Sequence, residues 1–162
     1  MRVKINWLDK QKRISVGSLL LFFCFSTTAD DLPRFEGWAR ASPQGASNAS
    51  VYGKFFNPGR SPVRLESIEF SGSEIASVHK MIDKDGMLGM RPGELIVGAQ
   101  ESVRLEPGGM HIMLMKLNAP LFNGCAYSLI FKWAGGKISA HKFFVGEIDQ
   151  STPPLFSDSC LN

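Results

Sequence analysis

The sequence contains few cysteines, little charge and no apolar stretch long enough to cross a bilayer. Three cysteines in 162 residues are too few for a small protein held together mainly by disulfides. Charged residues make up 20% of the chain and its mean hydropathy is −0.03, which excludes a disordered polyelectrolyte and a multi-span membrane protein. The length fits a single domain.

The first 29 residues have the three parts of a secretory signal. Five basic residues precede Ile14, an uncharged apolar run covers residues 14–25, and small residues lead to Ala29. The apolar run is shorter than the roughly 20 residues of a membrane span. We therefore predict export to the periplasm, cleavage after Ala29 and no stable membrane insertion afterwards. An uncleaved anchor is the alternative, while the bulky Phe22 and Phe23 before Cys24 disfavour a lipid attachment signal.

The basic character of the whole chain belongs to this leader. Removing residues 1–29 takes away five basic residues and one acidic residue, which leaves 13 basic against 14 acidic side chains. No later cluster of Lys and Arg suggests a surface that follows a phosphate backbone. Nucleic acid is therefore excluded as a partner.

The remainder of the chain has the pattern of a single β-domain over residues 30–148, followed by an irregular tail over 149–162. Short runs with β-type alternation are separated by Gly, Pro, Asn and Asp turns, and no helical periodicity is sustained. This pattern predicts an all-β, antiparallel β-sandwich. The expected strands lie near 35–41, 49–57, 63–70, 75–81, 101–106, 110–117, 126–133 and 137–145.

Two cysteines remain after removal of the leader, Cys125 and Cys160. Export to an oxidising compartment makes a disulfide between them chemically reasonable. The alternative is a buried Cys125 and a free tail that carries Cys160.

Histidine and methionine gather in one part of the chain. Residues 79–115 contain His79, His111 and all six methionines that follow the leader: Met81, Met87, Met90, Met110, Met113 and Met115. In a strand over 110–117, side-chain alternation places His111, Met113 and Met115 on one face. Imidazole and thioether together select Cu(I), whereas zinc would also recruit thiolate or carboxylate. Packing of the methionines in the core is the alternative.

The spacing of these residues resembles a known ligand pattern. His79, Met90 and the segment His111-Ile-Met113 follow one another as in the periplasmic copper(I) chaperone family that supplies the CuA centre of cytochrome c oxidase. Further similar stretches are Trp38-Ala-Arg40, residues 49–57, Met90-Arg-Pro92 and residues 107–115. The resemblance covers roughly residues 35–146.

The resemblance implies a Greek-key sandwich of cupredoxin-like or immunoglobulin-like type with a partly exposed Cu(I) site. The ligands that it implies are His79, Met90, His111 and Met113. Met81 and Met87 are candidate accessory ligands, and Lys80 places a positive charge next to His79 in the sequence. The expected partner is a copper acceptor, either a cytochrome c oxidase subunit or another copper-assembly protein, and the chaperone is expected to be a monomer.

Other functions find less support in the sequence. A blue-copper carrier needs a thiolate close to a histidine in the sequence, and no histidine lies near Cys125. No nucleophile elbow or phosphate-binding loop indicates an enzyme. A metal-free periplasmic interaction module and a copper storage or detoxification protein remain the alternatives to the chaperone.

Overall fold

Ten β-strands form the regular structure of the computed structural model, which describes residues 32–84, 86–155 and 160. The predicted signal lies outside these residues. No helix able to span a bilayer occurs among the described residues. The strands are β1 (Arg34–Arg40), β2 (Asn48–Phe56), β3 (Val63–Glu69), β4 (Ser73–Lys84), β5 (Met87–Pro92), β6 (Ile96–Val97), β7 (Ser102–Leu105), β8 (Met110–Leu117), β9 (Ala126–Trp133) and β10 (Lys137–Gly146).

The strands pair in the order β4-β8-β2-β1-β10-β9-β3, and the Ile68–Ala76 pairing of β3 with β4 closes the ring. The predicted all-β sandwich is thereby confirmed, with one correction. The pairing of β1 with β10 is parallel, whereas the other pairings among the described strands are antiparallel. A parallel pair cannot be joined by a tight turn, and these two strands come from the two ends of the domain, where no turn is needed.

The core is lined by alternate residues of the strands, as the sequence pattern predicts. Val51 of β2, together with Ile112 and Leu114 of β8, is fully buried. Phe55 packs edge-on against Phe131 and Trp133, with ring centroids 5.1 and 5.6 Å away. The opposite faces of β2 and β8 point away from this core, because successive side chains of a strand alternate.

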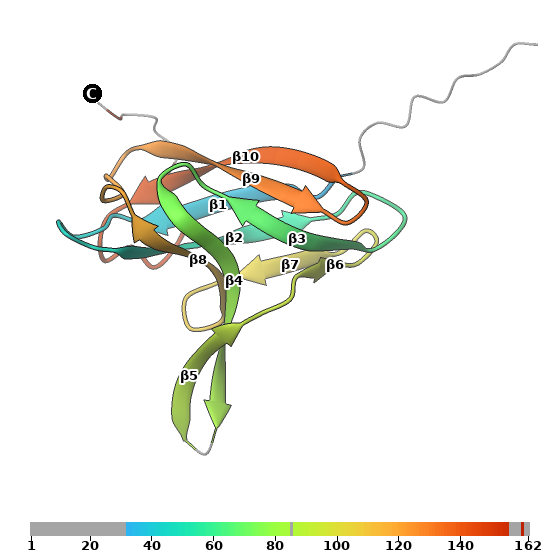
Figure 1. Ribbon diagram of the computed structural model, residues 1–162, viewed down its shortest axis with the longest axis horizontal. Helices are drawn as coiled ribbons and strands as arrows, with labels where there is room; N and C mark the ends of the chain where they lie inside the picture. Colours follow the sequence, from blue (N-terminus) through green and yellow to red (C-terminus); the bar gives the residue numbers. More distant parts are fainter. Residues whose placement is uncertain (1–31, 85, 156–159, 161–162) are drawn as a thin grey trace, which may run out of the picture.

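The segment after Met81 differs from the expectation. No expected strand covers residues 83–92, but β4 continues to Lys84 and pairs along its end with β5. The Asp83 carboxylate accepts a hydrogen bond from the backbone N–H of Gly86 (2.8 Å), and Gly86 has a φ of 80°, which glycine adopts without strain. The resulting β4–β5 hairpin projects from the body of the sandwich (Figure 1).

The chain after β10 returns along the body. The Arg40 guanidinium donates a hydrogen bond to the backbone oxygen of Gln150 (2.5 Å). Further on, a disulfide joins Cys160 to the buried Cys125. The tail is therefore attached to the domain at two points.

Candidate metal centre

The two histidines that the sequence singles out lie opposite one another on adjacent strands. His79 of β4 pairs with His111 of β8, and their ring centroids are 6.3 Å apart. Directly opposed residues of an antiparallel pair project from the same face of a sheet. Their neighbours Val78 and Ile112 point into the core, so the two imidazoles lie on the outer face.

Each ring has one nitrogen engaged and one without a partner. His111 Nδ1 donates to the backbone oxygen of Gly109 (3.1 Å), because a carbonyl oxygen can only accept, so Nε2 is the nitrogen that can offer a lone pair to a metal. His79 Nε2 bonds to the hydroxyl of Ser77 (3.0 Å). Among the described residues, three side-chain nitrogens are buried without a hydrogen-bond partner: His79 Nδ1 and His111 Nε2 on this face, and His141 Nε2 on β10.

Such unpartnered nitrogens are unusual, since buried polar atoms almost always form a hydrogen bond. A second nitrogen anchored to a carbonyl is also the arrangement that orients metal-binding histidines. The outer face thus presents two oriented imidazoles with free nitrogen atoms.

The protonation of His79 suits a ligand. Its pKa lies below the ordinary value of 6.5, because of desolvation by burial and, second, repulsion from His111. A lowered pKa keeps the imidazole neutral at pH 7, and only the neutral ring has a lone pair to offer a metal.

Met113 supplies the first sulfur on this face. It follows His111 by two residues on β8 and lies opposite Ser77 of β4 and Ser50 of β2. The Ser50 hydroxyl lies 3.9 Å from the Met113 sulfur. Met113 therefore shares the face of the histidines and is half-buried there.

Met90 enters the same face from the projecting hairpin. It lies opposite Met81, which follows His79 by two residues on β4. Alternation therefore puts Met90, Met81 and His79 on one side of the β4–β5 pair. The predicted ligands His79, Met90, His111 and Met113 thus share one face of three neighbouring strands, β5, β4 and β8, which we call the His/Met face.

The two candidate accessory ligands, Met81 and Met87, lie on opposite sides of the β4–β5 hairpin. Met81 joins the face of the predicted ligands, as its pairing with Met90 requires. Met87 lies opposite Lys84 and precedes Met90 by three residues on β5. Because side chains alternate along a strand, this odd spacing places Met87 on the other side of the hairpin, where its side chain is 72% exposed. The structure therefore does not bring Met87 to the histidines.

The positive charge of Lys80 is directed away from the histidines. Lys80 pairs with Met110 on one side and Arg91 on the other, and all three alternate with residues of the His/Met face. Its position next to His79 in the sequence is thus not a position next to the imidazole in space.

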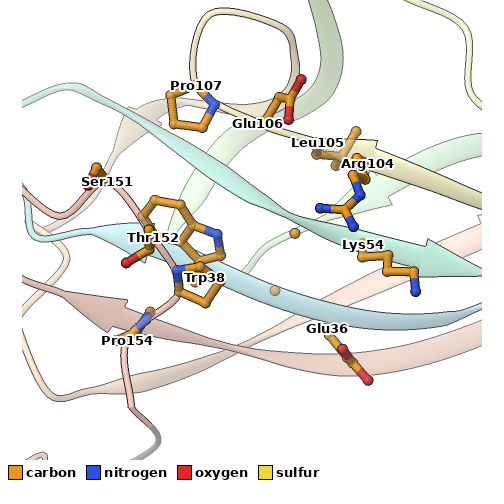
Figure 2. Close-up of a pocket in the computed structure, with 13 residues that line it drawn as sticks. Glu36, Trp38, Lys54, Arg104, Leu105, Glu106, Pro107, Ser151, Thr152 and Pro154 are labelled. Atoms are coloured by element: carbon orange, nitrogen blue, oxygen red, sulfur yellow. The ribbon is translucent and has the colours of Figure 1, made fainter.

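Two aromatic side chains that sequence reasoning did not assign to the site extend this face. The ring centroids of Tyr52 and His111 are 6.2 Å apart, and those of Trp38 and Tyr52 are 4.9 Å apart. Trp38 in turn lines a pocket of about 370 Å³ formed with β2, β7 and the tail (Figure 2). Figure 2 shows the tail residues Thr152 and Pro154 beside the indole, with Lys54 and Arg104 further along the pocket.

His141, the remaining histidine outside the leader, is separate from the centre. It lies on β10 with its ring 5.9 Å from that of Phe131. Within the part of the chain that the structure describes, no three side chains of His, Cys, Asp or Glu come close enough to hold one ion. The candidate centre consists of imidazoles and thioethers.

Comparison with known proteins places the chain in a family. Residues 36–142, more than half of the chain, match the model of the LpqE-like putative lipoproteins. The chain belongs to the LpqE-like family. A relative of this LpqE-like protein is the putative lipoprotein Lxx21020 of Leifsonia xyli subsp. xyli, which is 28% identical over 113 residues, or 68% of this chain and 67% of the relative.

Solved structures with the same fold are PCuAC domains. The apo PCuAC domain from PmoF1 is 19% identical, with a TM-score of 0.60 over 71% of this chain and 93% of that domain. The copper-bound PCuAC domain from PmoF2 is 18% identical, with a TM-score of 0.59 over 71% and 92%. Cu(I)-bound DR1885 from Deinococcus radiodurans is 22% identical, with a TM-score of 0.60 over 78% and 87%. The expected resemblance is thus confirmed for the fold.

Proposed function

We propose that this LpqE-like protein binds one Cu(I) ion through His79, Met90, His111 and Met113 and delivers it to an acceptor protein. The observation that carries the proposal is the opposition of His79 and His111, which leaves two buried imidazole nitrogens without partners on a face that also holds thioethers. Two neutral nitrogens and two neutral sulfurs are a soft ligand set that suits Cu(I). The copper-bound PCuAC neighbours have the same fold and support the assignment.

Delivery would proceed by ligand exchange. Thioethers are weak donors and leave one at a time as the ligands of the acceptor enter, while the ion stays monovalent. No covalent bond of either protein changes, so the protein acts as a carrier rather than an enzyme. Met90 is the most accessible of the four ligands, with 46% of its surface exposed, and we infer that it leaves first.

The cellular setting is part of the proposal. We infer that the leader exports the protein to the periplasm and is removed after Ala29, and that the acceptor serves assembly of the CuA centre of cytochrome c oxidase. The putative lipoprotein relatives are consistent with export. The mass of the mature protein separates cleavage after Ala29 from a retained leader and from lipid attachment at Cys24. Loss of oxidase assembly at low copper after gene deletion would support delivery, whereas poor survival only at high copper would indicate storage or detoxification.

The test of binding is a Cu(I) titration of the reduced, leader-free protein against a chromogenic chelator. We expect one ion per chain, with affinity lowered by about 100-fold or more in His111→Ala and Met113→Leu, because each removes a direct ligand. Met115→Leu is the matched control. Met115 is also a half-buried methionine of β8, two residues beyond Met113 on the same face, but lies opposite Ile75 instead of beside the histidines.

The outcome decides between two classes of protein. Tight uptake that is lost in both ligand variants and kept in Met115→Leu supports the chaperone. No uptake by the parent protein contradicts it and favours a metal-free interaction module.

A further inference from the structure

A second sulfur lies beside the proposed centre. Met81 pairs directly with Met90 across the β4–β5 hairpin, and the Cβ atoms of such opposed residues are about 5 Å apart. Met81 also follows His79 by two residues on the same strand face. The Met81 side chain is therefore next to Met90, the ligand that we infer leaves first, and next to His79.

The backbone of Met81 and the imidazole of His111 donate hydrogen bonds to the same carbonyl oxygen. The N–H of Met81 donates to the carbonyl oxygen of Gly109 (3.4 Å), and His111 Nδ1 donates to that same oxygen (3.1 Å). A carbonyl oxygen has two lone pairs and can accept both bonds. Met81 thus belongs to the framework that orients the His111 imidazole, although it lies on the hairpin.

Exposure rises in an ordered way across this face. His111 is 4% exposed, His79 and Met81 are half-buried, and Met90 is 46% exposed. Met81 is therefore more exposed than His111 and less exposed than Met90. On this face Met81 is adjacent to His79 along β4 and to Met90 across the pairing with β5.

We propose that Met81 is a fifth Cu(I) ligand, which exchanges with Met90 at the ion while the other three ligands stay bound. In this exchange the Met81 sulfur donates a lone pair to Cu(I) as the bond from Met90 sulfur breaks. No proton moves and no oxidation state changes. The inference rests on the proposed function, since it assigns a further residue to the same cargo.

The direct test uses the methyl groups of the methionines as reporters. The leader-free protein is labelled with ¹³C-methyl methionine and titrated with Ag(I), a soft monovalent ion that is inert to oxidation in air. We expect the methyl signals of Met90, Met113 and Met81 to shift by one equivalent. The Met87 signal is the internal control and is expected to stay, because its side chain lies on the other side of the hairpin.

The possible results separate the two proposals. Shifts of Met90 and Met113 with an unchanged Met81 overturn the fifth ligand and leave the proposed function standing. Unchanged signals of all three overturn the proposed function together with the inference. A shift of Met87 equal to that of Met81 also contradicts the inference, since it would show that the face of the hairpin does not matter.

A double-mutant cycle measures the exchange itself in Cu(I) competition. If Met81 and Met90 replace one another, each single substitution to Leu lowers the Cu(I) affinity by only about threefold to tenfold, while Met81→Leu/Met90→Leu lowers it by about 100-fold or more, beyond the product of the single effects. Leucine conserves the volume of methionine and preserves the fold, which circular dichroism verifies. Met87→Leu is the control on the same hairpin. No further loss when Met81→Leu is added to Met90→Leu overturns the proposal.

Discussion

The two faces of the β4–β8 ladder carry opposite chemistry on the same backbone. The inner face presents Val78, Ile112 and Leu114 to the core, where their apolar surface is removed from water. The outer face presents His79, His111 and Met113, with two imidazole nitrogens that lack a partner. Because successive side chains of a strand alternate, residues of the two faces are neighbours in the sequence. One pairing register therefore both builds the core and assembles the candidate centre.

This comparison teaches that stability and binding can be changed separately. The inner face contributes through buried area and close packing. The outer face has unsatisfied polar atoms, which lower stability until something binds them. Substitutions on the two faces should therefore produce different phenotypes, although the residues alternate in sequence.

The largest predicted effect separates the two faces most clearly. Ile112→Ala removes a fully buried side chain, and we expect a loss of about 4 kcal/mol in the free energy of unfolding. Met113→Leu, one residue further on the outer face, is expected to change this free energy by less than about 1 kcal/mol, because volume is conserved. Urea unfolding of the metal-free variants measures both values. Equal losses would contradict the division of the ladder into a core face and a binding face.

The next effect concerns the attachment of the tail. Cys160→Ser breaks the disulfide to Cys125 at its exposed end, and we expect a loss of about 3 kcal/mol because the unfolded chain is no longer constrained. Cu(I) affinity is expected to stay within about twofold, since neither cysteine lies on the His/Met face. Unfolding and chelator competition on the same sample check both statements. A marked loss of copper affinity would mean that the tail supports the centre.

The smallest effect is a pH dependence that belongs to the outer face. Because the pKa of His79 in the folded protein is below its unfolded value of 6.5, the unfolded chain takes up the proton first as the pH falls. The stabilising contribution is complete above about pH 6.5 and is lost as the pH falls through the folded pKa. Desolvation also lowers the pKa of His141, which adds a change of the same sign.

Urea unfolding of the metal-free protein at about pH 7.5 and about pH 5 measures this loss of stability. His79→Asn is expected to reduce the difference in the free energy of unfolding between the two pH values. Cu(I) affinity is expected to fall below about pH 6, because protons compete for the imidazole nitrogens and not for the thioethers. An affinity that is unchanged between about pH 7 and about pH 5 contradicts ligation by histidine.

The β4–β5 hairpin shows where prediction from sequence ends. Strands such as β3 and β7 alternate apolar and polar residues, and their positions follow from that pattern. β5 is almost fully exposed and contains Gly89 and Pro92, so no alternation marks it. It is a strand because its backbone groups pair with β4, a partner that the local sequence does not specify.

The candidate site divides in the same way. Alternation alone predicts that His111 and Met113 share a face, because both belong to one strand. The assignments of His79 and Met90 came from the resemblance, and their facing His111 and Met81 depends on the registers of β4 with β8 and β5. Sequence proximity was misleading for Lys80, and it offered no means of telling Met81 from Met87.

The sequence by itself thus determined the β class, the strands with alternating faces and the soft chemistry of the histidines and methionines, because these properties are local to each segment. Only the tertiary structure decided which side chains oppose one another, which sulfurs share a face with the imidazoles and which nitrogens are left without partners. Those outcomes depend on the register between strands, and register is set by the packing of the whole core.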